Sequence, residues 1–436
     1  MKTIHTDVLI IGGGPAGSTM GSYLARNNIR CTIVEKEKFP REHVGESLVI
    51  SCNKIFQDLD LFPDLEKANF PKKYGAAWSN TNKKTILSHD WRIYGIENTA
   101  SVLFGERQQE GVHSDYTYHV DRGLFDQILL NKSRQNGAEV YEESFVTSIS
   151  FKEDKSGVVC TAHHREEEMN IHAKMIVDAS GRATVVGRAL KIKENDPVFN
   201  QLAIHTWFED YARNEDVHKD YIYIHFLPYS HTWVWQIPIS ETITSIGLVT
   251  HKDHIKKSNK SLDEIFHEFI QTKTDVLTRI QSAKQLKPFK MEADYSYKMK
   301  HLTGDNFILI GDAARYVDPI FSSGVSIALN AARIAVHEVI QAVKTNNFTK
   351  ESFTYYNDTI ETGCKNWYEF ITLYYKLNVM FTWFISNPKY KSEVIRFLQG
   401  DVYEKEESFL IRDMKKMCND IEMNENHILH QYLNKK

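Results

Sequence analysis

The segment DVLIIGGGPAGSTMGSYLARNNIRCTIVE, residues 7–35, decides the fold. Its apolar start over residues 7–11 predicts a buried parallel strand, and residues 18–27 predict a helix after a glycine-rich turn. Residues 30–34 predict a second strand, which ends in the acidic Glu35. A strand, a G-x-G-x-x-G turn, a helix, a strand and an acidic residue within about 30 residues predict a dinucleotide-binding βαβ unit.

The three fingerprint glycines are expected to serve three purposes. Gly12 permits the sharp turn, Gly14 lets a pyrophosphate approach backbone N–H groups, and Gly17 allows close packing of helix and strand. Glu35 can accept hydrogen bonds from a ribose. A glycine turn in a cofactor-free α/β fold is the alternative, which the full βαβ context disfavours. FAD and NAD both remain open at this step.

Composition excludes several classes of protein. The 436 residues carry a formal net charge of −4 and no long Lys/Arg run, which argues against nucleic acid or an acidic membrane surface as a partner. Five scattered cysteines without a C-x-x-C spacing argue against disulfides and zinc, and favour a reducing cytoplasm. The nineteen histidines show no metal-ligand spacing, so we expect no metal site.

Two apolar stretches could be mistaken for targeting or membrane segments. The N-terminal run leads into glycines rather than into a small-residue cleavage site, so we expect no signal peptide. The stretch over residues 370–385 is interrupted by Lys376 and Asn378 and predicts a packed helix rather than a membrane span. We therefore expect a cytoplasmic protein without a membrane span.

The rest of the sequence predicts a second sheet, and then further elements of the first domain. Residues 199–250 alternate apolar and polar side chains with many aromatics, which predicts an antiparallel sheet. Residues 306–312 predict another buried strand, and residues 324–343 predict a long helix. The remaining predicted elements are a helix over 121–135, strands over 145–151, 157–162 and 175–181, and helices from 346 onward.

Three distant segments favour FAD over NAD. Arg122, the run Asp178-x-x-Gly181-Arg182, and the run Gly311-Asp312-Ala-Ala resemble FAD-contact motifs of flavin hydroxylase-like proteins. Asp312, at the carboxyl end of a strand, can accept from ribityl hydroxyls, and Arg122 can neutralise phosphate charge. Only one nucleotide-type glycine fingerprint exists in the chain, so reducing equivalents are expected from a separate NAD(P)H-dependent flavin reductase.

The predicted fold class is α/β, with three modules. They are a discontinuous Rossmann-like FAD-binding domain over residues 1–72, 118–190 and 288–345, an antiparallel-sheet substrate domain over residues 73–117 and 191–287, and a C-terminal helical cap over residues 346–436. Aromatic side chains of the cap between Trp367 and Phe384 recur at helical spacing, so most are expected in the core and a minority around the substrate.

Three further segments resemble flavin-dependent halogenases. Trp233-Val-Trp235-Gln-Ile-Pro238 matches the W-x-W-x-I-P signature of that family, residues 39–47 match F-P-R-x-x-x-G-E-S, and residues 70–75 match F-x-x-K-x-G. Ordinary sheet packing is the alternative explanation for two alternating tryptophans. The resemblance spans roughly residues 5 to 345 and weakens in the cap.

The resemblance implies a role for each motif. The two indoles separate the organic substrate from the flavin, so that a halide is oxidised to hypohalous acid. Lys73 is the implied catalytic residue, because its ammonium group can bind hypohalous acid or form a haloamine. A solvated lysine in a short loop is the alternative for Lys73, and Lys72 is expected to be a surface charge.

The run Asp-Pro-Ile-Phe-Ser-Ser-Gly over residues 318–324 precedes the long helix. The N–H groups of Ser323 and Gly324 therefore lie at a helix N-terminus, which is a natural anion site, and the family holds halide in this loop. A helix-capping serine is a compatible alternative. Tryptophan halogenases carry the run P-L-E-S-T-G at this place, so Phe321 occupies the position of their glutamate. This difference favours the phenol- and pyrrole-directed branch.

The resemblance thus implies a complete set of site residues. The implied FAD-binding residues are Gly12, Gly14, Pro15, Ala16, Gly17, Glu35, Lys36, Arg41, Ser47, Arg122, Gly311, Asp312 and Gly324. The implied tunnel and barrier residues are Trp233, Trp235, Pro238, Pro319 and Phe321.

The function implied is halogenation of an electron-rich phenol or pyrrole, free or tethered to a carrier protein, by reduced FAD, O2 and chloride or bromide. An FAD-dependent aromatic hydroxylase is the main alternative, because it shares the fold and the FAD motifs but leaves Trp233, Trp235 and Lys73 unexplained. A flavin reductase acting on an isoprenoid double bond and a non-catalytic flavin-binding module are two further alternatives.

Overall fold

The computed structural model describes residues 2–79, 99–165, 167–196, 199–213, 219–229, 231–256, 258–293, 296–427 and 429–430. The chain folds into two compact units, each assembled from three separate segments. The first unit contains residues 1–69, 120–196 and 296–362, and the second contains residues 70–119, 197–295 and 363–436. The predicted three-module division stays a prediction, and residues 80–98 of its sheet domain lie outside the described residues.

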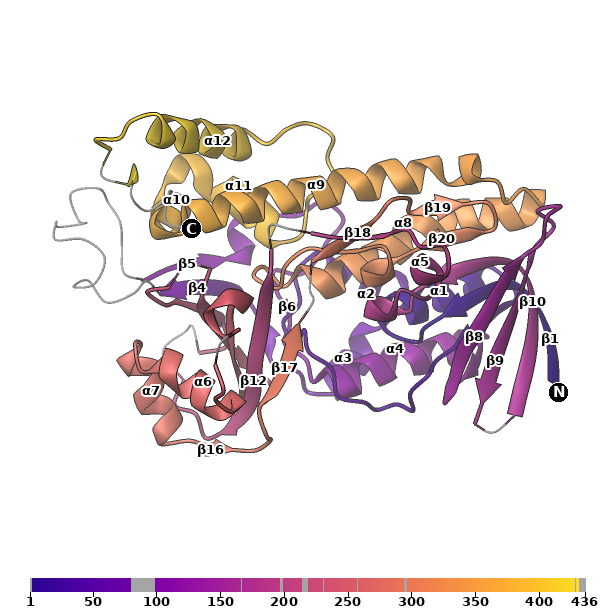
Figure 1. The fold of residues 1–436 in the computed structure, drawn as a ribbon, viewed down its shortest axis with the longest axis horizontal. Helices are drawn as coiled ribbons and strands as arrows, with labels where there is room; N and C mark the ends of the chain where they lie inside the picture. The colour runs from indigo at the N-terminus through magenta and orange to yellow at the C-terminus, as the bar shows by residue number, and fades with distance from the viewer. Residues whose placement is uncertain are drawn as a thin grey trace. The chain divides into compact units, whose positions relative to one another are not determined.

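The first unit is built on a mixed sheet whose central strands are parallel, as the βαβ segment predicts. Strand β1 pairs in parallel with β2 on one side and with β10 on the other, and residues 8–10 are fully buried. Strands β8 and β9 extend the sheet in antiparallel fashion from β10 (Figure 1). The strands are β1 (Lys2–Ile11), β2 (Cys31–Val34), β7 (Glu139–Tyr141), β8 (Ser144–Phe151), β9 (Val158–His164), β10 (Glu167–Asp178), β19 (Thr303–Gly304) and β20 (Phe307–Leu309).

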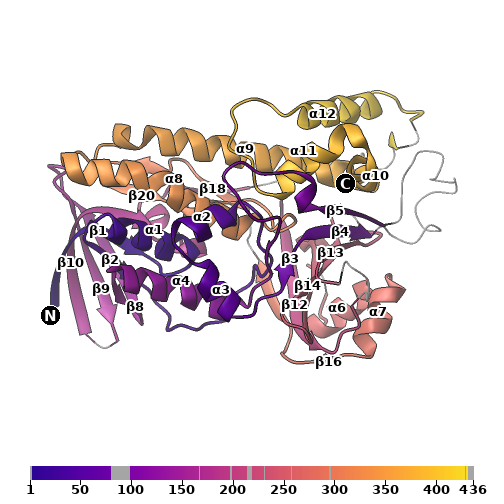
Figure 2. The ribbon, with the colours of Figure 1, turned by 180° about the vertical axis from the view of Figure 1, so that it is seen from behind.

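Helix α1 (Pro15–Arg26) follows the glycine turn and packs against α4 (Arg122–Asn136) and α8 (Ser323–Thr345), as Figure 2 shows. The sequence predicted the start of α1 at residue 18, three residues too late. Pro15 occupies the first turn, where its fixed φ favours helix and its missing N–H costs no hydrogen bond.

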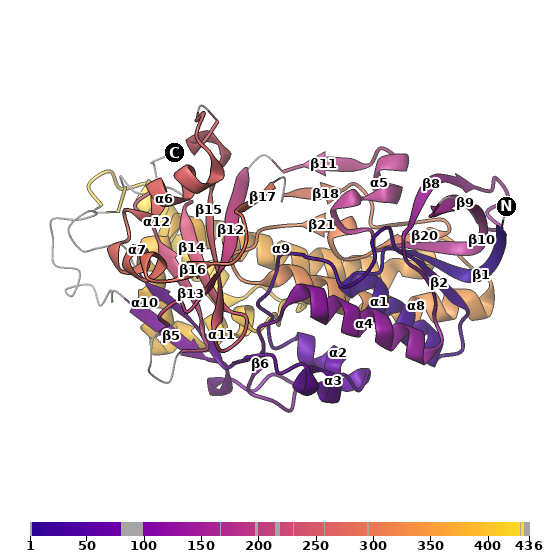
Figure 3. The same cartoon turned by 90° about the horizontal axis from the view of Figure 1, so that it is seen from below.

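Shorter elements complete the first unit. A small antiparallel sheet joins three strands that lie side by side in Figure 3. These elements are β11 (Lys193–Asn195), β18 (Tyr297–Met299), β21 (Arg315–Tyr316), α2 (Cys52–Asp58), α3 (Phe62–Lys67) and α5 (Val185–Ala189).

The second unit is built on a larger sheet, and the predicted antiparallel character of residues 199–250 is confirmed in their described part. One pairing in this sheet, between β4 and β13, is parallel. The strands of this unit are β3 (Lys72–Lys73), β4 (Gly75–Ser79), β5 (Thr99–Leu103), β6 (Thr117–Tyr118), β12 (Gln201–Glu209), β13 (Ile222–Phe226), β14 (Trp233–Pro238), β15 (Ile243–His251), β16 (Lys284–Gln285) and β17 (Lys290–Ala293).

The two faces of this sheet differ. Leu202, Ile204 and Val234 point to one face, where they join a hydrophobic core with Phe266 of α6 (Leu262–Ile270) and Val276 of α7 (Thr274–Gln281). Because side chains alternate along a strand, the residues between them point to the opposite face. That opposite face carries both tryptophans of β14, and we call it the tryptophan face.

The C-terminal region is helical, as predicted, but the single packed helix expected over residues 370–385 is wrong. Helix α9 (Thr354–Lys376) ends before a short 3-10 turn over Asn378–Met380, and α10 (Phe381–Ser386) starts a new direction. The remaining helices are α11 (Pro388–Leu398) and α12 (Phe409–Glu422). Among the helices of the described ranges, none combines the length and apolar character needed to cross a membrane.

Candidate active site

The glycine turn between β1 and α1 is shaped for the close approach of a ligand. Gly12 has a φ of +104°, and a Cβ there would lie 2.4 Å from the carbonyl oxygen of Ala179. A Cβ at Gly17 would lie 1.9 Å from the carbonyl oxygen of Gly12. At Gly14, by contrast, the nearest atom to an added Cβ is 3.6 Å away, on Arg41. Gly12 and Gly17 are therefore required by the fold, whereas Gly14 leaves room above the helix N-terminus.

The start of α1 offers unused hydrogen-bond donors. No side chain caps this helix, although four N–H groups at a helix start lack intrahelical partners. The helix dipole adds partial positive charge at the same end. Together with the absence of a close contact at Gly14, this geometry fits a phosphate group.

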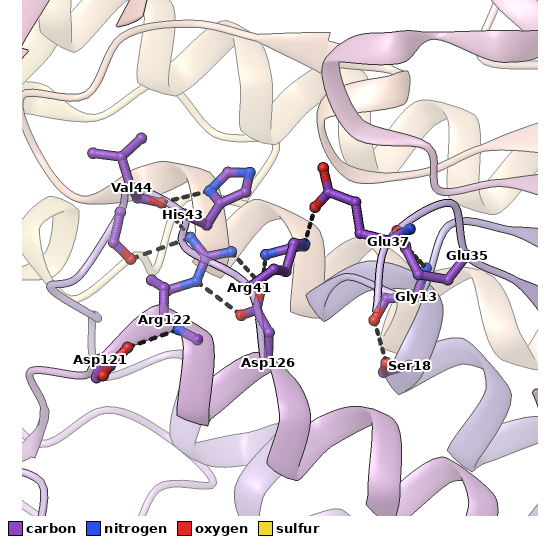
Figure 4. A network of polar contacts seen from close by, with 12 residues as sticks. Gly13, Ser18, Glu35, Glu37, Arg41, His43, Val44, Asp121, Arg122 and Asp126 are labelled. Atoms are coloured by element: carbon purple, nitrogen blue, oxygen red, sulfur yellow. Dashed lines mark hydrogen bonds and ion pairs between the residues drawn. The ribbon is translucent and has the colours of Figure 1, made fainter. Parts of the chain in front are cut away.

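The buried carboxylate of Glu35 holds the turn from the side. One oxygen accepts from the amide of Gly13 at 2.7 Å, and the other accepts from the amide of Glu37 at 2.8 Å (Figure 4). Burial raises the pKa of Glu35, and these two backbone bonds oppose that rise. Glu35 therefore fixes the shape of the turn, and its contact with a ribose stays a prediction. Neighbouring Lys36 is exposed, with its Nζ 3.6 Å from a carboxylate oxygen of Glu37.

Arg41 and Arg122 meet at a single buried carboxylate, Asp126. Arg122 binds it with two hydrogen bonds of 2.8 and 2.9 Å, and Nη1 of Arg41 lies 2.9 Å from the same carboxylate, as Figure 4 shows. Burial of Asp126 opposes ionisation, but the charge and hydrogen bonds of Arg122 outweigh it and lower the pKa of this carboxylate. Arg122 also donates to the carbonyl of Val44. The two arginines are thus held rigidly.

The side chains of Ser47 and Asp312 are among several in the first unit with polar atoms that make no hydrogen bond within the described residues. The hydroxyl of Ser47, in a side chain only 4% exposed, makes no hydrogen bond. The carboxylate of Asp312 also has no donor, and burial raises its pKa to about 6, although Arg182 and Arg122 pull it down. Buried polar groups are rarely left unpaired in native proteins. Ser47 and Asp312 therefore fit a ligand rich in hydroxyl groups, such as the ribityl chain of a flavin.

The loop that follows β10 is held by a buried carboxylate. The carboxylate of Asp178 accepts from the amides of Ser180 and Val186, at 2.9 and 2.7 Å, so this residue shapes the loop that follows β10. Gly311 has a φ of +60°, and a Cβ there would lie 3.2 Å from the Cβ of Ala16. The strand ends and α1 are thus packed closely at this edge of the sheet.

The start of α8 provides a second helix N-terminus. Ser322 precedes it in a left-handed conformation, with a φ of 57° and no side-chain cap. The amides of Ser323 and Gly324 have no acceptor in the described part of the chain. Phe321 is 3% exposed and Pro319 is half-buried, so the loop before the helix is largely apolar. This arrangement can bind a small anion.

Lys73 lies in the second unit and is not a solvated lysine. Its side chain is only 2% exposed, and its Nζ lies 5.4 Å from the ring centroid of Phe104. Strand β3 pairs with β6 so that Lys73 stands opposite Thr117, whose hydroxyl makes no hydrogen bond with any described residue. Lys72 is half-buried, with its Nζ 4.5 Å from the ring centroid of Tyr116.

His119 is the second ionisable group beside Lys73. Burial, followed by the positive charge of Lys73, lowers the pKa of His119 well below its usual value, so the imidazole is neutral. Its Nε2 lies 2.9 Å from the carbonyl oxygen of Asp220 and must donate to it, because a carbonyl only accepts. Nδ1 is then an acceptor, and no described residue donates to it.

Both signature tryptophans are buried on the tryptophan face. The indole of Trp235 donates to the hydroxyl of Ser245 at 3.1 Å, and the indole of Trp233 donates to the hydroxyl of Tyr375 at 3.0 Å. Gly247 lies opposite Trp235 on β15, and a Cβ there would lie 2.1 Å from the indole. The lack of a side chain at Gly247 therefore makes room for the indole of Trp235. Pro238, the last residue of β14, is also buried.

Some of these partners were not predicted. Asp126 follows Arg122 by four residues on a predicted helix, so the i,i+4 spacing of opposite charges was an available signal. Thr117, His119 and Ser245 carry no such signal, because only strand pairing brings them to Lys73 and Trp235. Within the described residues, no group of three His, Cys, Asp or Glu side chains could hold a metal ion.

Comparison with known proteins gives consistent matches over nearly the whole chain. The sequence profile of the tryptophan halogenase family matches residues 7–109 and 98–383. A 1H-pyrrole-2-carbonyl-(peptidyl-carrier protein) chlorinase from Pseudomonas fluorescens is 48% identical and covers 98% of this chain and 96% of that protein. The corresponding brominase from Pseudoalteromonas luteoviolacea is 30% identical, covering 91% of this chain and 92% of that protein.

Solved structures agree with the sequence matches. The flavin-dependent brominase Bmp2 superposes with a TM-score of 0.84 and 27% sequence identity, covering 96% of this chain and 99% of that chain. A flavoprotein/dehydrogenase from Cytophaga hutchinsonii superposes with the same TM-score at 26% identity. The predicted α/β fold class is confirmed.

Proposed function

The chain belongs to the tryptophan halogenase family of flavin-dependent enzymes, and from this premise we propose that it halogenates a pyrrole acyl group tethered to a peptidyl carrier protein. The proposed substrate rests on the 48% identity, over 98% of this chain, to a chlorinase named for 1H-pyrrole-2-carbonyl on such a carrier. The proposed co-substrates are reduced FAD, O2 and chloride or bromide. A separate NAD(P)H-dependent flavin reductase supplies the reduced flavin in this proposal.

FAD, when bound, would supply the oxidising chemistry that turns a halide into hypohalous acid. The glycine turn around Gly14 and the uncapped start of α1 would bind its pyrophosphate. Ser47 would donate to the cofactor, and Asp312 would accept from hydroxyl groups of the ribityl chain. Lys36, Arg41 and Arg122 would contribute positive charge around the phosphates.

The halide would bind at the start of α8. The amides of Ser323 and Gly324 point outward from a helix N-terminus, and the preceding Phe321 and Pro319 limit access of water. Phe321 also leaves position 321, where tryptophan halogenases have a glutamate, without a carboxylate. Such a site suits a substrate that is itself strongly activated, and pyrrole is electron-rich.

Lys73 is the proposed catalytic residue. Its ammonium group would bind hypohalous acid and direct the electrophilic halogen to the ring. The hydroxyl of Thr117 and Nδ1 of His119 have unused hydrogen-bonding capacity next to it, which suits a small polar reactant. The buried rings of Trp233 and Trp235 would keep the organic substrate apart from the flavin.

A reconstituted reaction tests the proposed function. The enzyme is incubated with FAD, a flavin reductase, NADH and each halide, against carrier-bound pyrrole-2-carbonyl and a panel of free pyrroles, phenols and indoles. The proposal expects halogenated product, identified by its isotope pattern, from the carrier-bound pyrrole and little from the free rings. Product with added oxygen and no halogen would support the aromatic hydroxylase instead.

A further inference from the structure

Gln201 is a buried residue on the tryptophan face, and only the oxygen of its side-chain amide has a hydrogen-bond partner. It begins β12, and its side chain is 3% exposed. Its Oε1 accepts from the hydroxyl of Tyr375 at 3.3 Å, whereas its Nε2 has no hydrogen-bond partner among the described residues. A buried donor without an acceptor costs about 1–3 kcal/mol.

The neighbouring hydrogen bonds fix which end of the amide is unpaired. The indole N–H of Trp233 can only donate, and it donates to the hydroxyl oxygen of Tyr375 at 3.0 Å. The single hydroxyl proton of Tyr375 is then directed to Gln201, which must present its oxygen. The NH2 group of Gln201 therefore faces away from this chain of hydrogen bonds.

Aromatic rings lie around Tyr375, the hydrogen-bond partner of Gln201. The ring centroid of Phe199 lies 5.2 Å from that of Tyr368 and 6.0 Å from that of Tyr375, and the ring of His231 lies 4.9 Å from that of Tyr375. All of these residues belong to the second unit. An unpaired donor among aromatic rings suits a planar aromatic ligand that carries one acceptor.

We infer that the NH2 group of Gln201 is the hydrogen-bond donor to the carbonyl oxygen of the substrate's aromatic acyl group. The inference rests on the proposed function and deepens it. A pyrrole nitrogen carries a proton and donates rather than accepts, so the carbonyl oxygen is the strong acceptor that a pyrrole-2-carbonyl thioester offers. Gln201 is thus a substrate-binding residue that selects acylated rings.

Binding measurements with two variants test this assignment. Gln201→Met removes the amide and keeps the length of the side chain, whereas Tyr375→Phe removes only the hydroxyl that Gln201 accepts from. We expect Gln201→Met to weaken binding of the pyrrole-2-carbonyl carrier about tenfold, because the substrate carbonyl loses its partner. Tyr375→Phe should cause a smaller loss, because the NH2 group remains although its orientation is no longer fixed.

A second carrier separates binding from folding. In this carrier a pyrrol-2-ylmethyl thioether replaces the acyl thioester, so the carbonyl is absent. Wild-type enzyme should bind it about tenfold more weakly than the acyl carrier, and Gln201→Met should bind the two alike. The wild-type comparison stands by itself if Gln201→Met does not fold.

Three results would overturn the inference. They are equal affinity of wild-type enzyme for the two carriers, wild-type affinity of Gln201→Met for the acyl carrier, and a larger loss in Tyr375→Phe than in Gln201→Met. Failure of the proposed function would be seen separately, as the absence of halogenated product with wild-type enzyme.

Discussion

We expect FAD affinity to depend on pH through the ionisation of Asp312. Burial raises its pKa to about 6 in the folded protein, so without a ligand it contributes stability at low pH that is lost as the pH rises through about 6. The carboxylate is the better acceptor for ribityl hydroxyls. FAD affinity should therefore increase about tenfold between about pH 5 and pH 8.

Flavin fluorescence titrations across this pH range measure that effect. Asp312→Asn should bind FAD with little pH dependence, because the amide does not titrate there. The same pH profile in wild-type enzyme and Asp312→Asn would show that another group is responsible.

Lys73 gives the second prediction at this scale. Lys73→Met keeps a similar buried volume but removes the charge and the donor, so halogenated product should fall at least about 100-fold. FAD affinity should stay at the wild-type value, because Lys73 is not among the proposed flavin-binding residues. The matched control is Lys72→Met, which changes the adjacent, half-buried lysine and should leave product formation intact. Wild-type product yield in Lys73→Met would contradict the catalytic role.

Single residues could be predicted from the sequence where a motif names them. The resemblance to halogenase motifs selected Trp233, Trp235 and Lys73, but the burial of Lys73 was not predictable from two adjacent lysines in a short segment. Gln201 carries no motif at all. Its proposed role depends on one hydrogen bond from Tyr375, on a helix more than 170 positions away.

The turn between β1 and α1 gives a prediction for an element. Gly17→Ala would place a Cβ 1.9 Å from a backbone oxygen, so the unfolding free energy should fall by about 2 kcal/mol or more. Gly14→Ala meets no atom closer than 3.6 Å and should leave stability within about 1 kcal/mol, yet weaken FAD binding by crowding the phosphate.

Urea unfolding of the two variants, followed by FAD titration, separates the two roles. The prediction is wrong if Gly14→Ala unfolds as easily as Gly17→Ala, or if it binds FAD as tightly as wild-type protein.

Elements with a strong period were the most predictable. Strand β2 and the long α8 were found to within about two residues. For β1 the predicted end at residue 11 is right, but the strand begins at Lys2 rather than at residue 7. The break after α9 was not, because residues 377–380 contain neither proline nor glycine and the apolar pattern continues through them. The parallel pairing of β4 with β13 could not be predicted either, because it depends on which edge of the sheet is available.

At the scale of the whole molecule, the chain leaves and re-enters its first unit twice. The recurrence of FAD-contact motifs near residues 12, 178 and 312 predicted that return. The sequence alone favoured phenols and pyrroles equally as substrates. The carrier-bound pyrrole follows from relatives that share nearly the full length of this chain.

Intact-mass analysis of the carrier protein tests the central claim most directly. A carrier loaded with pyrrole-2-carbonyl is incubated with the enzyme, FAD, a flavin reductase, NADH, O2 and chloride or bromide, and its mass is then compared with that of an enzyme-free control. The account predicts replacement of ring hydrogen by halogen, with the isotope pattern of the halide supplied. An unchanged mass with both halides, under conditions where the enzyme binds FAD and O2 is consumed, would contradict it.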